Sequence, residues 1–169
     1  PENQNFLESN RLSFFEMTVG MTFDYFAKSE VDIAIIETGL GGRLDSTNII
    51  TPQLSVITNI GLDHTAFLGT DLPAIATEKA GIIKNSVPVV IGERHDQTMP
   101  VFIAKAAEVD SPLFFADEFE LPEVDSDLIG TYQEYNKKTV LASIEVLRKG
   151  GWQITSEAII HGLNKVQSN

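Results

Sequence analysis

The chain has 169 residues, of which 43% are hydrophobic and 21% charged, a composition typical of a globular domain with one packed core. Its 12 basic and 24 acidic residues give a net charge of -12, which argues against nucleic acid and anionic membranes as partners. The chain contains no cysteine, so disulfides, thiolate catalysis and zinc-thiolate sites are excluded, and a cytoplasmic location is expected.

The first half of the chain alternates between helical and strand-like patterns. Residues 12–27 place Phe15, Val19 and Phe23 at helical spacing, which predicts a long, largely buried helix. Four short apolar runs rich in β-branched residues follow, each bounded by glycine, proline or polar residues. We predict that these runs are buried strands, at residues 31–37, 54–60, 87–92 and 112–116.

Helices are predicted between the later strands. Asp71 is placed to cap a helix that has Pro73 in its first turn, and the alanine-rich run 99–109 is apolar on one side. Strands that alternate with helices and are apolar on both faces indicate a parallel sheet covered on both sides. The predicted fold class is therefore α/β, with a doubly wound, mainly parallel sheet flanked by helices.

The last third of the chain begins with a long polar connection. Residues 117–130 are acidic and lack a clear period, which predicts an exposed loop, with a short edge strand at 119–121 as the alternative. A helix is predicted over 132–149, ending at Gly150-Gly151, and a second helix after it, capped by Thr155 or Ser156.

Polar residues gather where the first predicted strand ends, and open parallel sheets bind ligands at such ends. The strand leads into Glu37-Thr38-Gly39-Leu40-Gly41-Gly42-Arg43, a carboxylate beside three glycines. Glycines allow close backbone approach to a phosphate or a metal-bound ligand. A tight turn with an exposed glutamate is the alternative. A dinucleotide-binding fingerprint is excluded because Leu44 stands where its third glycine belongs.

Two further candidates follow the second predicted strand. His64 can ligate a metal through one ring nitrogen while Asp63 orients the ring, although a loop histidine is more often merely solvated. Lys79, in the next predicted helix, is by ordinary expectation a surface charge. Its cation would oppose a metal unless the amine had taken up carbon dioxide to become a carbamate. Spacing alone does not decide between these alternatives.

Three separated motifs, E-T-G-L-G-G-R-L-D-S-T-N, D-H-T and E-K-A-G-I-I-K, resemble in order the signature of folylpolyglutamate synthase/dihydrofolate synthase, in the Mur ligase superfamily. The resemblance implies a ligase that uses ATP to add glutamate to dihydropteroate or folate through an acyl phosphate. It also implies that Glu37, His64 and a carbamylated Lys79 hold Mg²⁺. The residue types alone would have suggested zinc or manganese, because histidine is an unusual ligand for magnesium.

Other segments extend the resemblance to nearly the whole chain. Ser13-Phe14-Phe15-Glu16 resembles the family's T-Y-F-E segment, which implies contact with the pterin, and Leu44-Asp45-Ser46 falls where the family also touches pteroate. The run Y-Q-E-Y-N resembles the family's H-Q-x-x-N helix start, which implies that Asn136 contacts the adenine of ATP. Core packing is the alternative for Phe15, and an ordinary helix surface for Asn136.

No Gly-Lys pair occurs in the chain, so the family's G-T-N-G-K-G-S phosphate loop is absent. We expect residues 1–169 to be a partial central ATP-binding domain that lacks this upstream loop and a carboxyl-terminal ligase domain, and to be inactive alone. The expected partners are ATP, glutamate, dihydropteroate or folate, and the missing remainder of its own chain. Two alternatives remain open: a murein-peptide ligase, and a non-catalytic flavodoxin-like module that binds a metal or a nucleotide.

Overall fold

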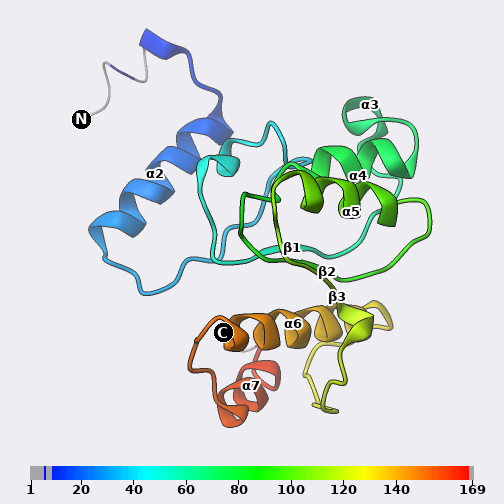
Figure 1. Cartoon of the computed structure of the whole chain (residues 1–169). Coiled ribbons are helices and arrows are strands. Elements are labelled where there is room, and N and C mark those ends of the chain that lie inside the picture. Colours follow the sequence, from blue (N-terminus) through cyan, green and yellow to red (C-terminus); the bar gives the residue numbers. More distant parts are fainter. Residues whose placement is uncertain (1–5, 7–8, 168–169) are drawn as a thin grey trace.

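A parallel three-stranded sheet forms the centre of the molecule (Figure 1). The computed structural model describes residue 6 and residues 9–167, so the expected domain, 1–169, extends beyond them at both ends. Strands β1 (Ser55–Ile57), β2 (Val89–Ile91) and β3 (Leu113–Phe115) lie side by side in that order. All pairings are parallel, which confirms the prediction for these three runs, although each strand is shorter than its apolar run.

Helices cover both faces of this sheet. Helices α4 (Leu72–Ala80) and α5 (Met99–Glu108) lie over one face, and α6 (Tyr132–Lys149) lies over the other (Figure 1). Helix α7 (Ser156–Leu163) packs on α6 on the side away from the sheet. The doubly wound α/β class predicted from the sequence is therefore confirmed.

Strand alternation divides the core between the two faces. Val89 and Ile91 pack with Phe102 of α5 in a cluster that also includes α4 side chains. Val90 points the other way and packs with Ala142 and Val146 of α6. All three residues of β2 are therefore buried, as is typical of a central parallel strand.

The helix ends follow the predicted capping residues. The Asp71 side chain accepts a hydrogen bond from the Ala74 N–H at 2.8 Å and begins α4, with Pro73 in the first turn. Thr155 caps α7 in the same way, through the Ala158 N–H at 3.1 Å. Short helical turns complete the order, namely η1 (Ser46–Ile49), α3 (Thr65–Leu68) and η2 (Ala116–Glu118).

The prediction of a buried strand at 31–37 is wrong. This segment forms no strand, and most of its apolar side chains are exposed, with Ile33 at 60% and Ile35 at 94%. A strand needs a neighbour for its backbone groups, and no strand in the described part of the chain pairs with this one. The apolar pattern was thus not sufficient to make a strand.

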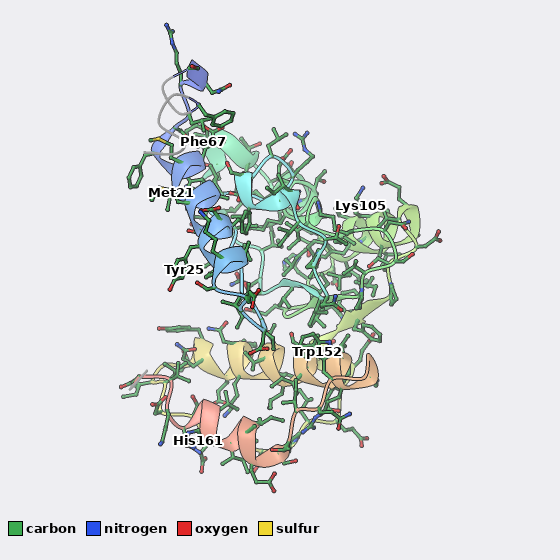
Figure 2. The ribbon with its side chains drawn as sticks, turned by 90° about the vertical axis from the view of Figure 1, so that its left-hand side faces the viewer. Met21, Tyr25, Phe67, Lys105, Trp152 and His161 are labelled. Atoms are coloured by element: carbon green, nitrogen blue, oxygen red, sulfur yellow. The ribbon has the colours of Figure 1, made fainter. Side chains whose placement is uncertain are left out.

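The first predicted helix forms, but the prediction that it is largely buried is wrong. Helix α2 spans Phe14–Lys28 and lies apart from the sheet, beside η1, with no buried residue (Figure 1). Met21 and Tyr25 project from it and are about two-thirds exposed, at 67% and 64% (Figure 2). A helical period identifies an apolar face, but it does not supply the surface that would cover it.

The acidic connection between η2 and α6 is only partly exposed. The alternative of an edge strand at 119–121 is not realised, yet Phe119 and Leu121 pack against the cluster below β2. Further along, the Asp127 carboxylate accepts hydrogen bonds from the Val166 and Gln167 N–H groups at 3.1 and 3.0 Å. The end of the described chain is therefore fastened to the loop that precedes α6. None of the described helices is long and apolar enough to cross a membrane.

Candidate functional site

The glycine-rich loop after residue 37 packs directly on the last turn of α4. Gly41 has a φ of 69°, which favours glycine, and a side-chain carbon there would lie 2.8 Å from Leu68 at the end of α3. A carbon on Gly42 would lie 2.9 Å from the Glu78 carbonyl oxygen and 3.0 Å from that of Lys79. These glycines therefore let loop, α3 and α4 approach one another without intervening side chains.

Polar contacts fasten the same loop to α4. The Arg43 N–H donates to the Glu78 carbonyl at 2.8 Å, and the Arg43 guanidinium binds the Glu78 carboxylate at 3.0–3.2 Å. The Asn48 amide donates to the Gly81 carbonyl at 3.0 Å, and the Lys84 ammonium donates to the Asn48 carbonyl at 2.9 Å. Two of the three recognised motifs thus form one connected unit.

Asp45 closes the turn within this loop. Its carboxylate accepts from the Leu40 N–H at 2.8 Å, the Thr47 N–H at 2.9 Å and the Thr47 hydroxyl at 2.5 Å. Burial acts to raise the pKa of Asp45, but these hydrogen bonds outweigh it and lower the pKa below its ordinary value. The side chain therefore fixes the loop that follows Glu37, while its neighbour Leu44 is 80% exposed.

The three predicted metal ligands lie on segments that converge. The segment of Glu37 leads into the loop, His64 directly precedes α3, whose Leu68 meets Gly41, and Lys79 lies on α4, whose carbonyl meets Gly42. Glu37 and His64 are exposed, and Lys79 is half-buried. The ammonium of Lys79 forms no hydrogen bond or ion pair with the described residues.

The donor set can be tested for its fit to a metal. Within the described part of the chain, no three His, Asp or Glu side chains form a cluster that could hold one. Of the three predicted ligands, Glu37 and His64 carry donor atoms for a metal as they stand, whereas Lys79 would do so only with its amine carbamylated. His64 adopts a left-handed backbone conformation (φ 50°), and its backbone N–H donates to the Asp63 carboxylate at 2.7 Å. The His64 ring nitrogen lies 3.6 Å from the same carboxylate, which is too long for a hydrogen bond.

The predicted pterin segment has a structural role that the sequence analysis missed. The Ser13 hydroxyl accepts from the Glu16 N–H at 3.2 Å, and the Glu16 carboxylate accepts from the Ser13 N–H at 2.7 Å. This reciprocal pair is a capping box, which the S-x-x-E spacing could have revealed. The Phe15 ring lies against Gly39, so it packs on the glycine loop, whereas Phe14 is 82% exposed.

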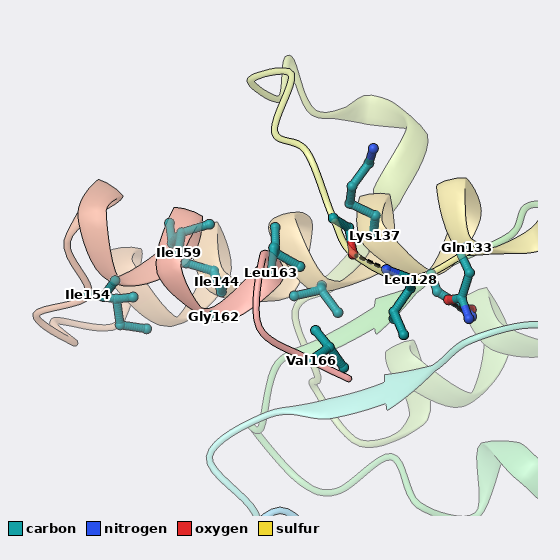
Figure 3. A pocket seen from close by; sticks show the side chains of 13 residues that line it. Leu128, Gln133, Lys137, Ile144, Ile154, Ile159, Gly162, Leu163 and Val166 are labelled. Carbon is teal, nitrogen blue, oxygen red and sulfur yellow. Dashed lines mark hydrogen bonds between the residues drawn. The ribbon is translucent and has the colours of Figure 1, made fainter. Parts of the chain in front are cut away.

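Asn136 lies elsewhere, at a cleft of about 350 Å³ between α6 and α7. The cleft is mainly apolar, and Figure 3 shows Ile144 of α6 opposite Ile159 and Leu163 of α7. The Asn136 amide donates to the Gln133 side chain at 3.1 Å, and both line the opening. Glu37, His64 and Lys79 do not line this cleft, so the structure does not bring Asn136 together with them.

Comparison with known proteins defines the class first. Residues 8–138 match the family described as the Mur ligase middle domain, and the chain therefore belongs to the Mur ligase family. Within that family its relatives are folate enzymes. The folylpolyglutamate synthase of Lacticaseibacillus casei is 37% identical over 88% of this chain, and the dihydrofolate synthase/folylpolyglutamate synthase of Bacillus subtilis is 35% identical over 89%.

Solved structures agree with this assignment. The FPGS-AMPPCP-folate complex matches with a TM-score of 0.85 and 30% identity, covering 95% of this chain and 46% of that one. Mycobacterium tuberculosis folylpolyglutamate synthase complexed with ADP and AMPPCP matches with a TM-score of 0.82 and 32% identity, covering 95% and 42%. The chain spans 40% and 41% of the length of the two relatives named above.

Proposed function

We propose that the intact protein is an ATP-dependent ligase that joins glutamate to dihydropteroate or folate, and that this chain supplies part of its central ATP-binding domain. The observation that carries the proposal is the likeness, over 95% of the chain, to a synthase in complex with AMPPCP and folate. The ligands named in that complex support ATP and a folate as ligands here.

The proposed reaction forms an amide bond in two steps. A carboxylate oxygen of the folate substrate attacks the γ-phosphorus of ATP, the bond to ADP breaks, and an acyl phosphate results. The amine of glutamate then attacks the acyl carbon, phosphate leaves, and a proton passes to solvent. Neither step needs a nucleophilic side chain, so the protein contributes positioning and charge stabilisation.

Glu37, His64 and Lys79 are the residues that we propose to hold Mg²⁺. Lys79 fits only as a carbamate, because its ammonium would repel the ion. Mg²⁺ bound there would supply positive charge beside the ATP phosphates. The converging segments of the glycine loop, α3 and α4 support a shared site.

Some of the residues predicted to contact the substrate already have a structural role in the fold, and others do not. Ser13 and Glu16 cap α2, and Asp45 closes the loop turn. Their exposed neighbours Phe14 and Leu44 are therefore the side chains that we propose to contact the pterin ring. Phe15 and Ser46 would support them, and Asn136 would contact adenine.

The test is glutamate incorporation by the full-length protein. Lys79→Ala should lower turnover at least about a hundredfold, the scale of losing electrostatic stabilisation of a transition state. Lys105→Ala, which removes a lysine paired with Glu108 on α5, should leave turnover unchanged. Wild-type turnover in Lys79→Ala would overturn the proposed site. Turnover with a nucleotide-linked murein peptide in place of folate would identify the rival ligase.

The 169-residue chain alone should show no turnover in the same assay. It contains no Gly-Lys pair, and a glycine-rich loop with a lysine is what holds the phosphates in such ligases. Measurable incorporation by this chain would show that the ATP site is complete without that loop.

A further inference from the structure

The ion pair between Arg43 and Glu78 joins the two segments that carry Glu37 and Lys79. The guanidinium makes three contacts of 3.0–3.2 Å with one carboxylate, a forked geometry that lysine cannot reproduce. The Glu78 side chain is 25% exposed and the Arg43 side chain 54%, so only the carboxylate is partly withdrawn from water. The two residues are 35 positions apart in the sequence, so the contact belongs to the fold.

This pair fixes how the last turn of α4 is rotated. Successive residues of a helix point about 100° apart around its axis, so holding Glu78 against Arg43 sets the direction of Lys79. The fit leaves no room for rotation, because a carbon on Gly81 would overlap the backbone of Arg43. Lys79 therefore leaves the helix in a different direction from Glu78, and no described carboxylate pairs with it.

The same pair fixes the loop on the other side. The Arg43 N–H is held by the Glu78 carbonyl, and Asp45 accepts the Leu40 N–H at 2.8 Å. The loop is thus held at two points between residue 40 and residue 43. Glu37 lies three residues before the first of them, so its position relative to α4 depends on this attachment.

We infer that Arg43 and Glu78 are positioning residues, which hold the glycine loop and the last turn of α4 in the arrangement that lets Glu37 and Lys79 share one cation. The inference rests on the proposed function, because it takes Lys79 to be carbamylated. In that reaction the ammonium of Lys79 first loses a proton to solvent, the neutral amine nitrogen bonds to the carbon of carbon dioxide, and a second proton leaves to give the carbamate. A cation shared with Glu37 stabilises the product.

The experiment measures carbamate directly in the full-length protein. Protein equilibrated with ¹³C-labelled carbon dioxide and Mg²⁺ is observed by ¹³C NMR, and Lys79→Arg, which cannot be carbamylated at this position, identifies the signal. Arg43→Gln should lower carbamate occupancy about tenfold, because the loop and the last turn of α4 lose the contact that holds them together, and a small misplacement of interacting groups has effects of this order or larger. Arg43→Lys, which keeps the charge but loses the fork, should lower it less.

Two further variants separate positioning from stability. The exchange Arg43→Glu with Glu78→Arg should restore most of the signal, since it rebuilds the pair in reverse. Arg94→Gln is the matched control, because Arg94 forms a comparable pair with Asp117 beyond the ends of β2 and β3. It should lower the urea midpoint of unfolding while leaving the carbamate signal unchanged.

The outcomes distinguish the two proposals. A wild-type signal that Arg43→Gln leaves unchanged would overturn the positioning role and leave the proposed ligand set intact. No signal in the wild type would overturn carbamylation itself, and the inference with it. If Arg43→Gln does not fold, Arg43→Lys provides the test. Full carbamate occupancy in Arg43→Lys would show that the forked contact of Arg43 with Glu78 is not needed.

Discussion

Asp45 shows how one side chain in the recognised motif serves the local structure. Its carboxylate takes three hydrogen bonds from Leu40 and Thr47, and these lower its pKa in the folded chain against the opposing effect of burial. Since the folded pKa lies below the unfolded one, Asp45 stabilises the fold fully above the unfolded pKa. That stabilisation is lost as the pH falls through the folded pKa.

Replacement of Asp45 by asparagine should therefore change the pH dependence of stability. The difference in free energy of unfolding between wild type and Asp45→Asn should be largest at neutral pH and shrink below about pH 4, near the ordinary aspartate pKa. Urea titrations at several pH values would measure it. Asp24→Asn, which removes an exposed acid on α2, is the control. A difference that grew in acid would contradict the assignment.

At the scale of elements, the central feature is the contact between the glycine loop and α4. Gly81 has an ordinary helical φ of -60°, so glycine is required there by space rather than by backbone conformation. A side-chain carbon would overlap the Cα and Cβ atoms of Arg43. The loop and the helix end must therefore separate if this position gains a side chain.

Gly81→Ala should destabilise the chain by about 1–3 kcal/mol, the usual cost of overfilling a packed contact. Gly162→Ala is the matched control, because nothing lies within 4 Å of the added carbon in α7. It should instead stabilise by about 0.5–1 kcal/mol, since alanine is a better helix former. Urea unfolding monitored by the single tryptophan would measure both. Equal effects would show that the contact is loose.

Helices and strands were predicted correctly from the sequence where the signal lies within the element itself. The strands at 54–60, 87–92 and 112–116 are short apolar runs between turn residues, α4 and α7 have side-chain caps, and α6 ends at Gly150. The segment at 31–37 has the same apolar pattern, but a strand also needs a partner. No property of the segment itself could show that the described chain offers none.

Some features of the candidate site could likewise be predicted from the sequence, and others could not. The motif positions of Glu37, His64 and Lys79 were visible in the sequence, and the structure shows that their segments converge; their roles stay predictions. The pairing of Arg43 with Glu78 could not be predicted, because no spacing rule connects residues on different elements. The capping box of α2 could have been predicted from S-x-x-E.

At the scale of the whole molecule, two segments of the first part of the chain carry exposed apolar side chains. Ile33 and Ile35 lie in the unpaired segment, and Met21 and Tyr25 project from α2. Exposed apolar groups that lie close together favour association, while the net charge of -12 opposes it. The balance between apolar attraction and charge repulsion determines how strongly the chain self-associates.

The 169-residue chain should self-associate, and Ile35→Lys should weaken this association in sedimentation velocity. The substitution reduces the magnitude of the net charge, which by itself would favour association, so a decrease must come from the lost apolar surface. Thr70→Lys, at an exposed polar position, makes the same change in charge without that loss. Equal sedimentation of the two variants would contradict the prediction.

The parallel sheet also has a consequence for how the chain folds. Ser55 pairs with Val89, and Val89 with Leu113, so every rung of the sheet joins residues separated by a whole helix. Among the described strands no pair forms a hairpin, so long loops must close before any strand contact forms. High contact order slows folding, so the helices should gain structure early and β2 should be the last element to become fully protected from hydrogen exchange during refolding.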